Sequence, residues 1–135
     1  MGKLNVRNLI VVMVLFLTVA AYSTSAGNLS GAVDNAFRNG NPGALGQHLS
    51  NDRKVSLSIP QLGIKPGSYS RQQVLALLRQ AFSEYRTVSF SQESSRGAIK
   101  ANWSVRNKTN GKVKNLTLYV SSGGSGSVIT SIRGG

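Results

Sequence analysis

Segment 98–121 constrains the fold more than any other part of this chain, because two runs of alternating apolar and polar residues meet at Asn110-Gly111. Asn-Gly favours a two-residue type I′ turn, in which both central residues take positive φ. Such a turn fixes the register of the two strands. It predicts apolar pairs on one face, namely Val105 with Leu116, Trp103 with Leu118 and Ala101 with Val120. It predicts polar pairs on the other face, namely Arg106 with Asn115, Ser104 with Thr117 and Asn102 with Tyr119.

The charge balance of the chain is strongly basic. Its 135 residues correspond to about one domain, and 16 lysines and arginines stand against four acids, which gives a formal net charge of +12. Cysteine is absent, so a disulfide, a thiolate metal site and a cysteine nucleophile are all excluded. A domain of this kind depends on buried apolar surface for its stability.

The amino terminus has the pattern of a secretion signal. Lys3 and Arg7 precede an apolar run over 9–21, and small residues follow it. A run of about 13 residues is short for a membrane span. We therefore expect a signal peptide over 1–26, cleaved after Ala26, and one secreted or periplasmic domain over 27–135. An uncleaved N-terminal membrane anchor is the alternative.

Two short helices are predicted ahead of the first strand. A helical stripe of apolar residues follows Ser30, and Asn39-Gly40 ends it. Asn41-Pro42 then favours a second, short helix, because asparagine can cap a helix and proline fits its first turn. Alternation over 54–59 predicts a strand that ends at Pro60.

A longer amphipathic helix is predicted after a loop at 61–68. Ser70 and Gln73 form a capping box, so this helix is expected to begin at Arg71. Its wide apolar stripe requires an apolar surface to cover it. The stripe consists of Val74, Leu77, Leu78, Ala81, Phe82 and Tyr85.

The remaining strands are expected to complete an antiparallel meander. Val88 and Phe90 begin a strand that a tight connection over 94–97 joins to the hairpin. This connection predicts two further pairs, Phe90 with Ala101 and Val88 with Trp103. After a glycine-serine loop at 121–127, the last strand is expected to place Val128 and Ile132 beside Val120 and Leu116. Four antiparallel strands would then share one apolar face, covered by the helices.

Several short segments extend this pattern to a family resemblance. They are Gly40-Asn41 followed by Leu45 and Leu49, Val55-Ser56-Leu57, Tyr69-Ser70-Arg71-Gln72-Gln73, and Leu77-Leu78-Arg79-Gln80-Ala81-Phe82 before Phe90. With the order of elements, they resemble an uncharacterised family of secreted bacterial proteins, a domain of unknown function in the nuclear transport factor 2-like (cystatin-like) superfamily. The resemblance implies an α+β cone in which N-terminal helices pack on a curved, mainly antiparallel sheet. It covers 30–132 and implies the fold more than any activity.

Four residues are candidates for lining a pocket between the helices and the sheet: His48, Tyr69, Tyr85 and Trp103. A small apolar ligand is the partner that such a pocket would take, because tyrosine and tryptophan combine an apolar body with a polar tip. Ordinary core packing is the alternative for Tyr85 and Trp103. A lone histidine without cysteine or paired carboxylates is a poor metal site, so neither a metal nor a cofactor is expected.

Five basic residues on and around the hairpin are candidates for anion binding: Lys100, Arg106, Lys108, Lys112 and Lys114. Their charge suits an anionic polymer or an anionic membrane surface. Nucleic acid is disfavoured, because the chain is expected to be secreted and only Tyr119 adds an aromatic side chain to this polar face. A homodimer contact through the sheet face and a simply solvated face are the alternatives.

The four acids, Asp34, Asp52, Glu84 and Glu93, are not expected inside the cone. The family resemblance implies that an isomerase or hydrolase of this fold would need an acid there, beside a tyrosine or histidine. We therefore expect a non-enzymatic binding domain, for a small ligand or a partner in the cone. Anion binding through the basic sheet face and an isomerase or hydrolase activity are the alternatives.

Overall fold

The computed structural model describes residues 29–95, 97–123 and 128–135. In chain order they form α2 (Leu29–Arg38), η1 (Pro42–His48), β1 (Val55–Ile59), η2 (Pro60–Leu62), β2 (Ile64–Tyr69), α3 (Arg71–Glu84), β3 (Tyr85–Ser95), β4 (Ala98–Asn107), β5 (Val113–Gly123) and β6 (Val128–Gly134). The expected signal peptide over 1–26 lies outside the described residues. Within the described ranges, no helix combines the length and apolar character needed to cross a membrane.

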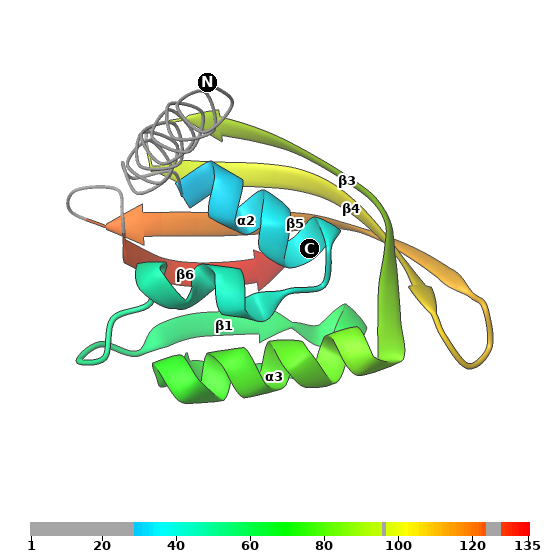
Figure 1. Ribbon diagram of the computed structural model, residues 1–135, viewed down its shortest axis with the longest axis horizontal. Coiled ribbons are helices and arrows are strands. Elements are labelled where there is room, and N and C mark those ends of the chain that lie inside the picture. Colours follow the sequence, from blue (N-terminus) through cyan, green and yellow to red (C-terminus); the bar gives the residue numbers. More distant parts are fainter. Residues whose placement is uncertain (1–28, 96, 124–127) are drawn as a thin grey trace, which may run out of the picture.

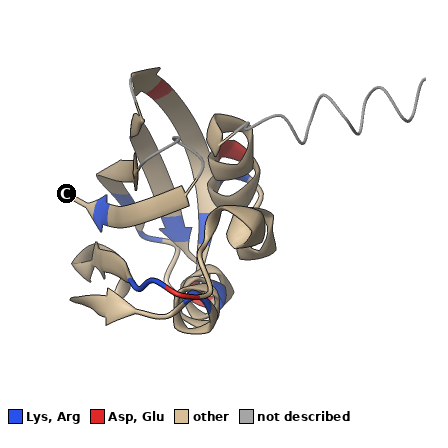
Figure 2. Ribbon diagram, turned by 90° about the vertical axis from the view of Figure 1, so that its left-hand side faces the viewer, with Lys and Arg blue, Asp and Glu red and all other residues tan. Residues whose placement is uncertain are grey.

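The six strands form one curved sheet in the order β2-β1-β6-β5-β4-β3. β1 and β6 run parallel, and the other neighbouring strands are antiparallel. Figure 1 shows α2 and α3 on the same side of this sheet, and Figure 2 shows the helices and the strands as two layers from the side. The predicted fold class, an α+β cone with N-terminal helices on a curved, mainly antiparallel sheet, is confirmed.

The predicted starts of the second and third helices, at Pro42 and Arg71, are confirmed, but only the third is an α-helix. Ser70 Oγ accepts a hydrogen bond from Gln73 N at 3.3 Å, and Gln73 Oε1 accepts one from Ser70 N at 2.9 Å, which completes the capping box of α3. The helix after Asn41 is a 3-10 helix without a side-chain cap. Its two glycines disfavour a regular α-helix, and 3-10 geometry serves for a short piece.

The hairpin formed by β4 and β5 has the predicted faces but a different register. Trp103 pairs with Leu116 instead of Leu118, and the other predicted pairs shift in the same way. The observed apolar pairs are Ile99 with Val120, Ala101 with Leu118 and Trp103 with Leu116. The observed polar pairs include Lys100 with Tyr119, Asn102 with Thr117 and Ser104 with Asn115. Because side chains alternate with a period of two, a shift of two residues leaves each side chain on its predicted face.

A four-residue loop in place of the expected two-residue turn causes this shift. Asn107 N donates to the carbonyl of Lys112 at 2.8 Å, so the loop consists of the four residues between them. Asn107 Oδ1 also accepts hydrogen bonds from the backbone N–H groups of Thr109 and Asn110, at 2.8 and 3.1 Å. Gly111 in this loop has a φ of 72°, which is the positive value that the Asn-Gly pattern predicts.

β3 contains a bulge that overturns the predicted pairing with β4. The register shifts between Thr87 and Ser89, and Phe90 pairs with Trp103 instead of Ala101. Val88, which was expected opposite Trp103, is 49% exposed. A bulge inserts one extra residue into a strand. The residues before the bulge therefore face the opposite way from the one that the alternation after it predicts. Thr87 therefore faces inward.

The expected loop over 61–68 is wrong, because most of it forms η2 and the edge strand β2. Gly63 has a φ of 81° and ends the 3-10 turn, after which β2 returns along β1. Lys65 and Pro66 suit an edge strand, since a charge and a residue without an N–H discourage further pairing. The last strand lies beside β5 as predicted, but its register differs, because Ile132 lies opposite Val120 instead of Leu116 and Val128 lies opposite Gly123.

Candidate anion-binding surface

Trp103 belongs to the aromatic core under α2. Its ring centroid lies 5.1 Å from that of Phe37 and 6.0 Å from that of Phe82. Its Nε1 donates to Thr87 Oγ1 at 2.9 Å, and Thr87 Oγ1 donates to the carbonyl of Phe37. Phe90, the cross-strand partner of Trp103, stacks on Phe37 with the ring centroids 6.0 Å apart. These rings fill the space between α2 and the sheet.

The other pocket candidates lie at separate places. His48 is buried in η1, and Tyr85 is buried at the start of β3. Tyr69 is half-buried at the end of β2, where its hydroxyl donates to the carbonyl of Lys65 at 2.8 Å. Three strands separate β2 from β4, which carries Trp103. The four candidates are thus distributed over η1, β2, β3 and β4.

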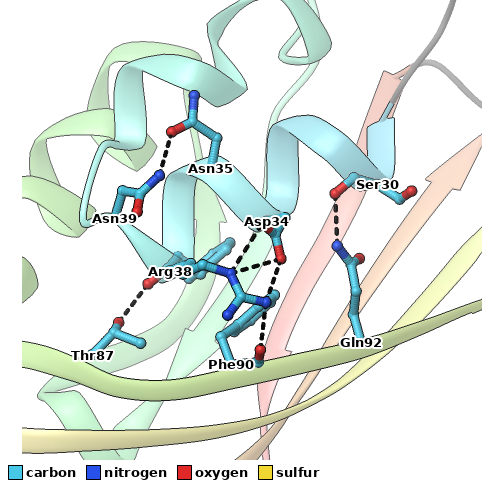
Figure 3. A network of polar contacts seen from close by, with 9 residues as sticks. Ser30, Asp34, Asn35, Arg38, Asn39, Thr87, Phe90 and Gln92 are labelled. Atoms are coloured by element: carbon cyan, nitrogen blue, oxygen red, sulfur yellow. Dashed lines mark hydrogen bonds and ion pairs between the residues drawn. The ribbon is translucent and has the colours of Figure 1, made fainter.

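An ion pair on α2 ties this helix to the edge of the sheet (Figure 3). Arg38 Nη2 lies 2.8 Å from Asp34 Oδ1 and donates to the carbonyl of Phe90 at 2.6 Å. The hydrogen bonds from Arg38 hold the pKa of Asp34 below its usual value. Gln92 Nε2 donates to the carbonyl of Ser30 at 2.7 Å, so α2 is attached to β3 near both of its ends.

The other three acids, Asp52, Glu84 and Glu93, are exposed. Asp34 is itself occupied by Arg38, and the two lie beside β3 at the edge of the sheet. Within the described ranges, no three or more His, Cys, Asp or Glu side chains come together as a metal site would require.

The face of the sheet that points away from α2 and α3 is polar and carries several cations; we call it the outer sheet face. Lys100 and Arg106 are both exposed there. On the neighbouring strands, the guanidinium carbon of Arg133 lies 5.3 Å from the ring centroid of Tyr119. The outward positions on β4 and β5 include Ala98, Lys100, Asn102, Ser104, Arg106, Val113, Asn115, Thr117, Tyr119 and Ser121. Figure 2 shows basic positions along the strands and the loops below them.

A shallow hollow lies in the middle of the outer sheet face. It has a volume of about 320 Å³ and lies between β4, β5 and the carboxyl end of the chain. Hydroxyl and amide groups are available at its wall, and Ser104 Oγ donates to Asn115 Oδ1. Its lining residues are Asn102, Trp103, Ser104, Asn115, Leu116, Thr117 and Gly135.

Three of the five anion-binding candidates, Arg106, Lys108 and Lys114, also donate to backbone carbonyls. Lys108 Nζ donates to the carbonyl of Phe82 at 2.8 Å, and Lys108 N donates to that of Glu84 at 2.9 Å. These bonds cap the carboxyl end of α3, where carbonyls lack helical partners and a positive charge is favourable. The loop thereby becomes attached to α3.

Lys114 lies at the end of the sheet near η2. Its Nζ donates to the carbonyl of Gln61 at 2.9 Å and to the hydroxyl of Tyr85 at 3.2 Å. The same atom lies 5.2 Å from the ring centroid of Tyr85. Lys112, in contrast, is exposed next to the hairpin loop.

Two cationic hollows lie where β3 begins and β4 ends, beside the β4–β5 loop. One has a volume of about 310 Å³ and is lined by Arg86, Arg106, Asn107, Lys108 and Gly111. The other has a volume of about 160 Å³ and is lined by Arg38, Asn39, Gly40, Phe82, Tyr85, Arg86, Thr87 and Lys108. Arg86 and Lys108 line both hollows.

Sequence reasoning did not identify Arg86 as a candidate. Arg86 pairs directly with Arg106 across the two strands, so both side chains point outward. Without the bulge at Val88, the alternation from Phe90 would place Arg86 on the inner face. The sequence does place Arg86 before the first strand of the predicted β3–β4 hairpin and Arg106 near the end of its second strand. The bulge, however, decides that both side chains lie on the outer face.

Neither known family models nor curated proteins match this sequence. Solved structures do match the fold. A DUF4783 family protein from Bacteroides uniformis has a TM-score of 0.59 and 20% identity, over 79% of this chain and 95% of that one. An NTF2-like protein of unknown function from Cytophaga hutchinsonii has a TM-score of 0.52 and 11% identity, over 75% and 80% of the two chains.

A protein with a ketosteroid isomerase-like fold from Catenulispora acidiphila, solved in complex with trimethylamine, also matches, with a TM-score of 0.56 and 14% identity over 80% and 84% of the two chains. Two further matched structures carry provisional isomerase and polyketide cyclase names, at 14% and 11% identity. These likenesses show an NTF2-like fold for this chain, and the expected resemblance to an uncharacterised family of that superfamily is confirmed at the level of fold.

Proposed function

We propose that this chain is a secreted, non-enzymatic binding domain that holds an acidic polysaccharide on its outer sheet face. The observation that carries the proposal is the chemistry of this face. Lys100, Arg106 and Arg133 provide positive charge there, and most of the positions between them carry hydroxyl or amide groups. Glu93 is the acid among the described outward positions of β3. Such a surface attracts a polyanion over a distance and offers many hydrogen bonds at contact.

A polysaccharide fits this surface better than a membrane does. A protein that binds at a membrane interface inserts large apolar side chains into the lipid. Among the described residues, the large apolar side chains that stand exposed are two valines, Val88 at the bulge of β3 and Val113 at the start of β5, at 49% and 47%. The hydroxyl and amide groups around the hollow beside Asn115 match the hydrogen-bonding groups of a sugar chain. Tyr119 adds an aromatic ring to the same face.

The packing of aromatic side chains inside the cone favours a binding site on the outer sheet face. Trp103, Phe37 and Phe90 occupy the space under α2 that a small apolar ligand would need. The positions of the four acids support a function without acid-base chemistry, since Asp34 is engaged by Arg38 and the other three are exposed.

Retention on immobilised heparin and alginate, eluted with a salt gradient, tests this proposal. The variant Lys100→Gln/Arg106→Gln should elute from both at a clearly lower salt concentration than the wild type, because two cations of the binding face are lost. The matched control Lys54→Gln/Arg79→Gln removes two exposed cations elsewhere on the molecule and should elute much closer to the wild type.

Equal losses in the two double variants would mean that retention reflects net charge alone, which would contradict a binding face. Binding to vesicles that contain phosphatidylglycerol, combined with no retention on either polysaccharide, would also overturn the proposal.

A further inference from the structure

Arg86 and Arg106 form an unusual pair in the sheet. They stand directly opposite each other on β3 and β4, with both side chains exposed. Like charges in directly opposed positions of an antiparallel pair repel each other and destabilise the sheet. A neutral polar residue on the edge strand β3 would avoid this repulsion. A nearby negative charge would compensate for it.

No described residue supplies that charge. The ion pair found within the described ranges joins Asp34 and Arg38, and neither Arg86 nor Arg106 takes part in it. Arg106 makes one long hydrogen bond, from Nη1 to the carbonyl of Gly111 at 3.5 Å. The guanidinium of Arg86 has no hydrogen-bond partner among the described residues. Its N–H donors remain available to a ligand.

The two arginines line a hollow whose third cation is held in place. This hollow has a volume of about 310 Å³, and Lys108 also lines it. The bond from Lys108 Nζ to the carbonyl of Phe82 uses one of three N–H donors and fixes the ammonium at the end of α3. Two arginines with forked donors and one lysine therefore line the same concave place.

We propose that this hollow is a discrete phosphate site, which binds a phosphate monoester between the guanidinium groups of Arg86 and Arg106. This proposal rests on the proposed function, because the bound polysaccharide would be the polymer that carries the phosphate. A phosphate monoester has a charge of about −1.5 to −2 near neutral pH and three terminal oxygens. It can thus neutralise two arginines and accept hydrogen bonds from both forks. A carboxylate has one charge and two oxygens, which a single fork already satisfies.

Thermal unfolding in inorganic phosphate tests the site, with sodium chloride adjusted to keep the ionic strength constant. The melting temperature of the wild type should rise with phosphate and approach the logarithmic dependence of a single binding site. Acetate at the same ionic strength should produce no comparable rise, whereas sulfate, which also carries two charges and several terminal oxygens, should produce a rise similar to that of phosphate. An equal rise in all three salts would overturn the proposal.

The variant Arg86→Gln gives the site a two-sided signature. Without phosphate and at low salt, its melting temperature should exceed that of the wild type, because the repulsion across the strands is removed. Its response to phosphate should be lost. Arg86→Lys, which keeps the charge but not the fork, should bind phosphate about tenfold more weakly than the wild type. A normal phosphate response in both variants would overturn the proposal.

Arg79→Gln is the matched control, because Arg79 is an exposed arginine on α3 that lies outside the hollow. It should keep the full response to phosphate. Loss of polysaccharide retention in the wild-type experiment, with the phosphate response intact, would reject the proposed function and leave this site standing. Strong retention without any phosphate response would reject the site alone.

Discussion

At the scale of single residues, Arg38 joins the first described helix to the sheet. An exposed ion pair four residues apart on a helix contributes little to stability by itself. Here Arg38 also donates to the carbonyl of Phe90 on β3, and Asp34 holds its guanidinium in the position that this bond needs (Figure 3). The pair therefore contributes to the attachment of α2 as well as to the helix itself.

The pH dependence of stability should reveal this role of Asp34. Its pKa is lowered in the folded state, mainly by the hydrogen bonds from Arg38, so its contribution is present above the pKa of the unfolded chain and is lost as the pH falls through the lower folded value. Urea unfolding of the wild type should lose more stability between about pH 6 and about pH 2 than that of Asp34→Asn. Asp52→Asn, which removes an exposed turn carboxylate, is the control. Equal losses in wild type and Asp34→Asn would contradict the prediction.

At the scale of elements, the β4–β5 loop connects the hairpin to α3. Asn107 organises its backbone through two hydrogen bonds from its own side chain, and Lys108 binds two carbonyls at the end of α3. The loop thus sets the register of the hairpin and places the cations of the proposed phosphate site. A two-residue turn would not provide Lys108 at this position.

Replacement of Gly111 tests this account of the loop. Gly111 has a positive φ, and an added Cβ would meet no atom within 4 Å, so the effect of Gly111→Ala should come from backbone strain alone. We expect a loss of about 1–2 kcal/mol in the free energy of unfolding. Thr109→Ala, which changes an exposed side chain in the same loop, should stay within about 0.5 kcal/mol of the wild type. Denaturant unfolding measures both, and similar values for the two variants would refute the strain.

At the scale of the whole molecule, the charge is one-sided. The formal net charge is +12, with four acids in the chain, and Asp34 is already paired with Arg38. Self-repulsion of this kind destabilises the compact state and is screened by salt, since the Debye length falls to about 10 Å at 0.1 M ionic strength. An anionic partner would relieve the same repulsion by binding to the folded protein.

Salt should therefore stabilise this protein. We expect the melting temperature to rise as sodium chloride increases from very low concentration to about 0.15 M. In Lys54→Glu/Arg79→Glu, each substitution changes the charge by two units, and the rise should be smaller. Differential scanning calorimetry provides the measurement, and a melting temperature that falls with salt would contradict the prediction.

The sequence alone determined most of the elements, but not η2 or β2, and the direction of most side chains. The capping box at Ser70 placed α3, because its two hydrogen bonds are local. The alternation in 98–121 predicted correctly that Trp103 and Leu118 face the core, since alternation depends only on the pleat of the strand. Basic residues near the hairpin, among them Arg106 and Lys108, could be named as candidates from their positions in the chain.

Only the tertiary structure decided the register and the composition of the candidate site. A shift of two residues preserves every face, so the pattern of apolar residues could not distinguish the pairing of Trp103 with Leu116 from that with Leu118. The bulge at Val88 is also silent in the alternation, yet it turns Arg86 outward beside Arg106 and Thr87 inward beneath Trp103. The bulge depends on contacts between segments far apart in the chain, and the loop is held both by its own hydrogen bonds and by the contact of Lys108 with α3, so the alternation of apolar and polar residues encodes neither.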